Sequence, residues 1–130
     1  MKLYLPSILL FLILGCSKEN NSSKTTNAIL KLPEKIFDFG KISQKDTINH
    51  RFELINNSEV PLTIRNVSAS CGCTVPSWDK EPIAPSKKGF INITYIPNSS
   101  GQINKSIVVE TNTDSVFNVL YLKGFVKETE

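Results

Sequence analysis

The sequence predicts an all-β protein, an immunoglobulin-like antiparallel β-sandwich of about seven strands. Short segments in which apolar and polar residues alternate recur along the chain, which is the pattern of half-buried strands. Clusters of Asn, Ser, Pro and Gly separate these segments, as turns require. No segment shows the periodicity of an amphipathic helix. Six or seven such strands in about 100 residues favour a sandwich.

The expected strands follow one another along the chain. The first covers residues 36–40 and is short and aromatic, and the second covers 47–55 with alternating apolar residues. The others are expected at residues 62–67, 90–96, 103–110 and 116–126. The phase of alternation predicts nine inward side chains: Phe39, Phe52, Leu54, Ile64, Val67, Ile93, Tyr95, Val108 and Leu120. Antibody domains pair cysteines from two different strands, a pattern that is absent here.

The first fifteen residues predict an export signal. Lys2 is followed by an almost wholly apolar run over residues 3–14. This run is too short to span a bilayer, which needs about 20 apolar residues, but it fits the apolar region of a secretory signal. It ends in Gly15-Cys16, as in the lipobox of bacterial lipoproteins. Residues 1–15 are therefore expected to be a lipoprotein signal peptide and Cys16 the lipidated residue, the alternative being an ordinary signal with a chance cysteine.

The chain after the signal predicts a tethered domain. Residues 16–32 are expected to form the lipidated cysteine and a flexible tether, because residues 17–27 contain no large apolar side chain. A random coil of that length reaches about 20 Å. Residues 33–127 form the expected domain and 128–130 a tail. Ser17 is compatible with sorting to the outer membrane, where the periplasmic face is favoured over the cell surface.

Composition limits the function. The 130 residues carry 15 basic and 12 acidic side chains, and removal of the signal takes away one basic residue and leaves a net charge of +2. This charge is too small to predict nucleic-acid binding. The chain has a single His and no P-loop, dinucleotide or HExxH motif, so we expect neither an enzyme nor a cofactor. We expect a monomer that contacts the membrane through its lipid.

Cys71 and Cys73, separated by Gly72, are the most informative pair. Because Cys16 carries lipid, these two thiols remain in an oxidising compartment, which favours a disulfide. Extended i and i+2 residues lie about 6.6 Å apart, at the upper limit for a disulfide, and Gly72 permits a bend through positive φ. The three-residue ring would contribute only about 1.5 kcal/mol and would be easily reduced.

Four interpretations of the cysteine pair stay open. The favoured one is a local disulfide that rigidifies the loop after the third strand. The others are a redox-active or thiol-exchange pair, a soft-metal site for Cu(I) or Zn, and two reduced, packed thiols. A metal would need further ligands, and His50 lies on another strand in its apolar phase, where a half-buried structural role is expected. Trp78 is expected to pack on the core or cover the loop, the alternative being that it exposes a binding surface.

A resemblance to a known family becomes visible in the order of the motifs. They are Phe37-x-Phe39-Gly40-x-Ile42, Phe52-x-Leu54-x-Asn56, Leu62-x-Ile64-x-x-Val67, Ser70-Cys71-Gly72-Cys73-Thr74, Trp78, Pro82-Ile83-x-Pro85 and Gly101-x-x-x-Lys105. Over about residues 33–127 the chain resembles the bacterial family named only as domain of unknown function 1573. It is also similar to immunoglobulin-like sandwiches of the major-sperm-protein and Hydin type. The resemblance implies a fold and a compartment but no biochemical activity.

These observations predict a membrane-anchored, exported lipoprotein. Its immunoglobulin-like domain is expected to be non-enzymatic and to bind or scaffold an unknown protein or glycan of the cell envelope. The alternative is an envelope thiol-redox or copper-handling protein that uses Cys71 and Cys73.

Overall fold

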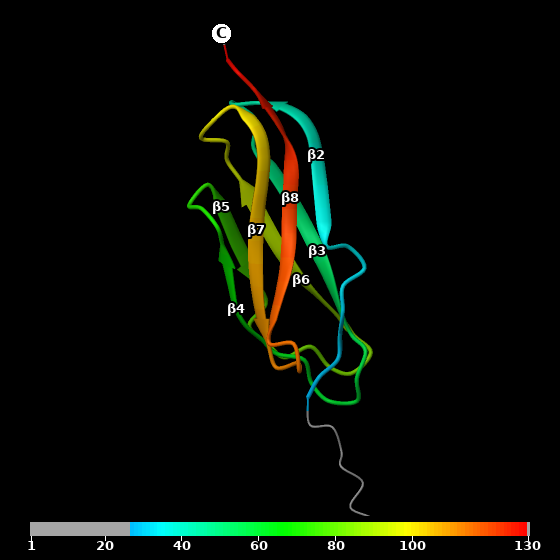
Figure 1. The fold of residues 1–130 in the computed structure, drawn as a ribbon. Helices are drawn as coiled ribbons and strands as arrows, with labels where there is room; N and C mark the ends of the chain where they lie inside the picture. The colour runs from blue at the N-terminus through cyan, green and yellow to red at the C-terminus, as the bar shows by residue number, and fades with distance from the viewer. Residues whose placement is uncertain (1–26, 130) are drawn as a thin grey trace, which may run out of the picture.

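The computed structural model describes residues 27–129, which form a β-sandwich (Figure 1). In this part of the chain, eight strands make two four-stranded sheets. One sheet has the order β1 (Leu30–Lys31), β3 (Ile48–Asn56), β6 (Lys88–Tyr95) and β5 (Thr74–Trp78). The other has the order β2 (Ile36–Ser43), β8 (Phe117–Lys127), β7 (Gly101–Thr111) and β4 (Ile64–Ala69). The predicted all-β sandwich is confirmed.

The core lies between the two sheets and follows the alternation of their strands. Seven of the predicted inward residues are buried: Phe52, Leu54, Ile64, Val67, Ile93, Tyr95 and Leu120. Phe39 is half-buried and stacks on Tyr95, with ring centroids 5.5 Å apart. Burial raises the pKa of the Tyr95 hydroxyl above its ordinary value, because the charged form loses its hydration. Tyr95 therefore stays neutral at physiological pH.

The prediction for Val108 is wrong by one residue. Ile107 and Val109 are fully buried, whereas Val108 is only partly buried and lies on the outer face. Ile107, Val108 and Val109 are consecutive apolar residues, so alternation alone does not fix which of them points inward. The pairing of β7 with β8 decides the phase, because Ile107 lies opposite the buried Leu120.

Two strands were not predicted. β5 contains Pro76, which interrupts the strand pattern, but β5 is an edge strand that pairs only with β6. Proline has no N–H to donate. An edge strand tolerates it at a position where the backbone faces away from the neighbouring strand, because no partner in the sheet needs that N–H. β1 is only two residues long and pairs with the end of β3.

The domain begins earlier than predicted. Residues 28–32 were assigned to the flexible tether, but Ala28 is buried and forms a bridge with Thr113. In addition, the Asn57 amide donates a hydrogen bond to the Ile29 carbonyl at 2.8 Å. The apolar residues after Asn27 are therefore part of the sandwich and do not belong to the predicted tether. The predicted end of the domain at residue 127 coincides with the end of β8.

One strand pair departs from the expected antiparallel arrangement. β2 runs parallel to β8, with Ile36 beside Tyr121, while the remaining strand pairs are antiparallel. The register of β2 shifts between Asp38 and Lys41. Gly40 adopts a φ of 71° there, and its amide donates to Asp38 Oδ1 at 2.8 Å. This is the geometry of a bulge that a glycine permits.

The chain enters the sandwich at one end. Asn27, the β7–β8 turn and the loop before β6 gather there, whereas β8 leads to the C-terminus at the opposite end (Figure 1). The loop between β4 and β5 lies on the edge where the chain passes from one sheet to the other. Figure 1 shows this loop directed away from the entry end.

Candidate functional site

The structure brings together Cys71 and Cys73, the two cysteines that the sequence analysis expects to pair. The Sγ atoms of Cys71 and Cys73 lie at bonding distance, 1.96 Å, and their Cα atoms are 5.3 Å apart. A turn shortens the separation, because the Thr74 amide donates to the Cys71 carbonyl at 3.3 Å. The expectation that Gly72 would use a positive φ is wrong, since positive φ among the described glycines occurs only at Gly40 and Gly101. The loop follows β4, which is the third of the predicted strands.

Backbone hydrogen bonds hold this loop to both sheets. At its start, the Ser70 amide donates to the Ser106 carbonyl at 2.9 Å, and the Ser106 amide donates to Ser70 Oγ at 3.2 Å. At its end, the Ile96 amide donates to the Cys73 carbonyl at 2.9 Å. The loop is therefore held by β7 on one side and by the end of β6 on the other.

The surroundings of the two sulfurs differ. Cys73 is buried at 8% exposure, while Cys71 is partly exposed. Thr74 is buried, and its Oγ1 lies 3.7 Å from Cys71 Sγ and 4.0 Å from Cys73 Sγ. Within residues 27–129, these sulfurs are the hydrogen-bonding partners of that hydroxyl. A side chain at Gly72 would meet no atom within 4 Å, so the space above the loop is open.

The other residues that the sequence analysis highlights, His50 and Trp78, have surroundings that fit structural roles. His50 is half-buried, as predicted: its ring stacks on Phe37 at 3.6 Å and its Nε2 lies 2.7 Å from Glu34 Oε2. Trp78 packs against the core from β5, and Lys80 Nζ lies 3.0 Å from the centre of its ring. Across residues 27–129, no group of three or more His, Cys, Asp or Glu side chains is placed to hold a metal. Cys16, the predicted lipidation site, lies outside the described residues.

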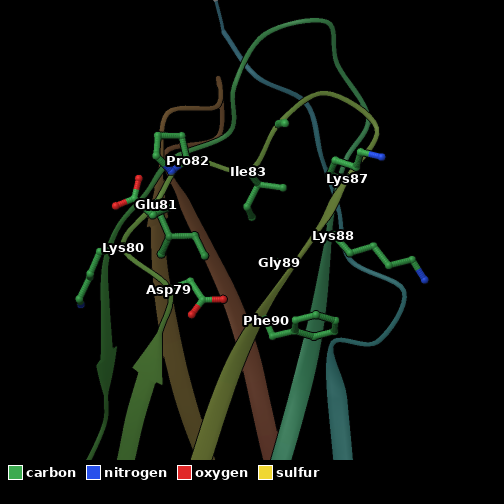
Figure 2. Close-up of a pocket in the computed structure, with 11 residues that line it drawn as sticks. Asp79, Lys80, Glu81, Pro82, Ile83, Lys87, Lys88, Gly89 and Phe90 are labelled. Atoms are coloured by element: carbon green, nitrogen blue, oxygen red, sulfur yellow. The ribbon is translucent and has the colours of Figure 1, made fainter.

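The sequence did not predict a cleft of about 520 Å³ at the entry end. It lies beside the loop that joins β5 to β6 (Figure 2), and Ile83 is one of the residues that line it. Lys87 and Lys88 lie on one side and Asp79 and Glu81 on the other. Lys88 Nζ is already paired with Glu53 at 3.0 Å. Two residues of the Pro82-Ile83-x-Pro85 motif line this cleft. Ile83 packs against Gly89 so closely that any side chain at residue 89 would clash with it.

The outer face of β8 is unusually apolar. Phe117 is 64% exposed, Ile36 49%, Phe125 40% and Tyr121 37%. Phe117, Tyr121 and Phe125 alternate with the buried Leu120 and Leu122, so they share one face of the sheet. Ile36 joins them, because it lies beside Tyr121 in the parallel register. The partly exposed pair Val108 and Val119 lies on the same face. We call this surface, formed by Ile36, Val108, Phe117, Val119, Tyr121 and Phe125, the β8 face.

The family of the chain follows from its sequence match. Residues 30–126 match the family described as "Protein of unknown function (DUF1573)". The chain belongs to this family. No curated protein matches this DUF1573 chain. Residues 27–129 contain no helix long and apolar enough to cross a membrane.

Structures of other proteins confirm the fold of the DUF1573 domain. A protein of unknown function from Porphyromonas gingivalis W83 is 17% identical to this chain, with a TM-score of 0.69. The match covers 82% of this chain and 51% of that protein's chain. The present chain thus spans about half the length of that protein. The ASH/PapD-like domain 7 of human CEP192 is 14% identical, with a TM-score of 0.67 and coverages of 96% and 100%. WR4, a C. elegans MSP family member, is 10% identical, with a TM-score of 0.51 and coverages of 78% and 100%. At these identities the likeness concerns the fold alone.

Proposed function

We propose that this chain is an exported lipoprotein, anchored through Cys16 in the outer membrane on its periplasmic side, whose non-enzymatic DUF1573 domain binds an envelope protein through the β8 face. The observation that carries the binding role is the exposure of four large apolar side chains, Ile36, Phe117, Tyr121 and Phe125, on one face of one sheet. The anchor is supported by the apolar run that ends in Gly15-Cys16.

The β8 face has the composition of an interaction surface. Single exposed apolar residues are ordinary on soluble proteins, but contiguous apolar patches mark contacts with partners. Aromatic side chains dominate the energy of such contacts when they lie at the centre and polar groups surround them. Here the aromatic row on β8 is bordered along β7 by Gln102, Asn104 and Ser106, which lie opposite Phe125, Lys123 and Tyr121.

Charge indicates what kind of protein fits this face. Lys41 lies beside Phe125 and Lys127 beside Ser43, while Lys123 lies between Tyr121 and Phe125 on the same face. Asp38, beside Lys123, is the acidic side chain at this end of the face. The complementary partner is therefore a protein with an apolar patch that has carboxylates along one border. A glycan would use the aromatic rings but would not need the lysines.

A photo-crosslinking amino acid at Tyr121 is expected to yield one protein adduct of defined mass in intact cells. The matched control carries the same group at Asn92, which is exposed on the outer face of the other sheet, and should give no such adduct. Adding Lys41→Glu to the Tyr121 variant should reduce the adduct, because the change repels a carboxylate-bordered partner. Equal labelling at Asn92, or an adduct that resists protease and yields to glycan-cleaving enzymes, would show that the proposed partner is wrong.

Replacement of Cys16 by alanine is expected to abolish membrane anchoring. Without the thiol no diacyl group can be attached, so the chain should stay an uncleaved precursor or appear as a soluble form. Incorporation of a fatty-acid probe and partition into detergent measure this result. The control is the Cys71→Ser, Cys73→Ser double variant, which should label as strongly as the unaltered chain. Continued labelling of the Cys16→Ala variant contradicts the anchor.

A further inference from the structure

We propose that the Cys71–Cys73 pair is a thiol–disulfide exchange site that oxidises an external dithiol. In this reaction the incoming thiolate attacks Cys71 Sγ, Cys73 is the leaving sulfur, and the Thr74 hydroxyl stabilises the thiolate that forms. The inference goes beyond the proposed binding function and does not depend on the β8 face, since it rests on the loop between β4 and β5.

The first argument is that the fold does not need this bond. The loop is fixed at Ser70 to β7 and at Cys73 to Ile96 by backbone hydrogen bonds. A ring of three residues adds little to that restraint, because disulfide stabilisation grows with the length of the closed loop. The bond can therefore open and close while the sandwich stays folded, which a site of reversible exchange requires.

The second argument is that the two cysteines differ in exposure. Cys71 is partly exposed and Cys73 is buried. The Gly72 position between them faces open space, so the backbone of a partner can approach the ring closely. Exchange depends on which sulfur an external thiolate can reach. This geometry selects Cys71 as the sulfur that is attacked.

The third argument concerns the leaving group. Thr74 Oγ1 is buried beside the two sulfurs, 3.7 Å from Cys71 Sγ and 4.0 Å from Cys73 Sγ. A hydroxyl that donates to a thiolate lowers the energy of that thiolate, because hydrogen bonds to charged groups are stronger than those to neutral ones. A thiolate of lower basicity leaves faster in exchange. Thr74 is thus within reach of both thiolates that the reaction releases, Cys73 in the first step and Cys71 in the second.

The reaction balances with a dithiol as the co-reactant. The first partner thiolate forms a bond to Cys71 Sγ, the Cys71–Cys73 bond breaks, and Cys73 leaves as a thiolate. The second partner thiolate then attacks the partner sulfur of this mixed disulfide and releases Cys71 as a thiolate. The partner is oxidised to a disulfide, two electrons pass to the cysteine pair, and protons from solvent restore two thiols.

The direction of attack is tested with reduced glutathione on the full lipidated chain in detergent. The folded protein is incubated with glutathione, quenched with acid and alkylated, and fragment-ion mass spectrometry locates the adduct. We expect the glutathione on Cys71 and the alkyl group on Cys73. An adduct on Cys73, or a pair that reacts only after denaturation, would overturn the proposal. Reduced protein that retains one equivalent of copper or zinc instead of reacting would also overturn it.

The role of Thr74 is tested with two variants. Thr74→Val keeps the shape of the side chain but removes the hydroxyl, and Thr74→Ser keeps the hydroxyl. Reduction of the folded protein by dithiothreitol should slow by about tenfold in Thr74→Val and return close to the original rate in Thr74→Ser. Far-ultraviolet circular dichroism checks that both variants stay folded. Equal rates in the two variants would exclude a role for the hydroxyl in the exchange.

Discussion

Replacing Phe52 by alanine is expected to lower the free energy of unfolding by about 3–5 kcal/mol. Phe52 is fully buried on β3, where the His50 ring meets it edge-on with centroids 4.7 Å apart. Removal of the ring loses its transfer free energy and leaves a cavity. The sheets cannot collapse into that space, because the β3–β6 ladder fixes the backbone on both sides of residue 52.

Urea denaturation of the full chain, compared with and without Phe52→Ala in the same detergent, measures this effect as a shift in midpoint with an unchanged slope. Phe117→Ala is the matched control, since it removes the same ring from a position that is 64% exposed. The control should change stability by no more than about 0.5 kcal/mol. A Phe52→Ala loss below about 1 kcal/mol would mean that the ring is not part of the packed core.

The alternation of apolar and polar residues predicts the inward face of a strand when the apolar residues fall mainly in one of its two alternating sets of positions, which we call phases. In β3 the apolar residues Ile48, Phe52 and Leu54 share one phase and the other phase is polar except for Ile55, so the predicted inward positions of Phe52 and Leu54 are correct. β7 has adjacent apolar residues, so pairing with β8 and not periodicity decides which of them is inward. β5 contains Pro76, and only its position at a sheet edge makes the proline acceptable. An edge position is a property of the assembled sheet and cannot be seen in a local segment.

The sequence also predicts only part of the candidate site. The spacing of Cys71 and Cys73 predicts a local pair, and the structure supports the favoured disulfide interpretation by its sulfur distance. The β8 face also had a signal in the sequence, because residues 117–126 are apolar in both phases although one face has no partner sheet. The contact of Thr74 with both sulfurs had no such signal. It depends on how the turn at Gly72 returns the chain over the sulfurs.

Asn56 is a fully buried polar side chain at the entry end of the sandwich. Its Nδ2 donates to the carbonyls of Val60 at 2.8 Å and Ile83 at 2.9 Å. Its Oδ1 accepts from the Ser58 amide at 3.0 Å and from Ser58 Oγ at 2.6 Å. One side chain thus joins the end of β3 to the loop after it and to the loop before β6. Every polar atom of the amide has a partner, which is the condition for a polar group to be tolerated in a core.

Asn56→Asp is therefore expected to cost at least about 3 kcal/mol at neutral pH. The change removes both donors and places a carboxylate against the carbonyl oxygens of Val60 and Ile83. Burial and these oxygens disfavour the charged form, so the pKa of the new carboxyl should be higher in the folded than in the unfolded chain, where it is about 3.9. A raised folded pKa means that the variant is least destabilised below about pH 4 and loses stability as the pH rises through the folded value.

Asn56→Ala is the control, because it has no titrating group. Its deficit of about 2–4 kcal/mol should therefore be similar at acidic and neutral pH. Denaturation of both variants at about pH 4 and pH 7 separates the charge from the lost hydrogen bonds. Equal deficits for Asp and Ala at both pH values would show that the carboxylate adds no cost to the lost hydrogen bonds, which would contradict the prediction.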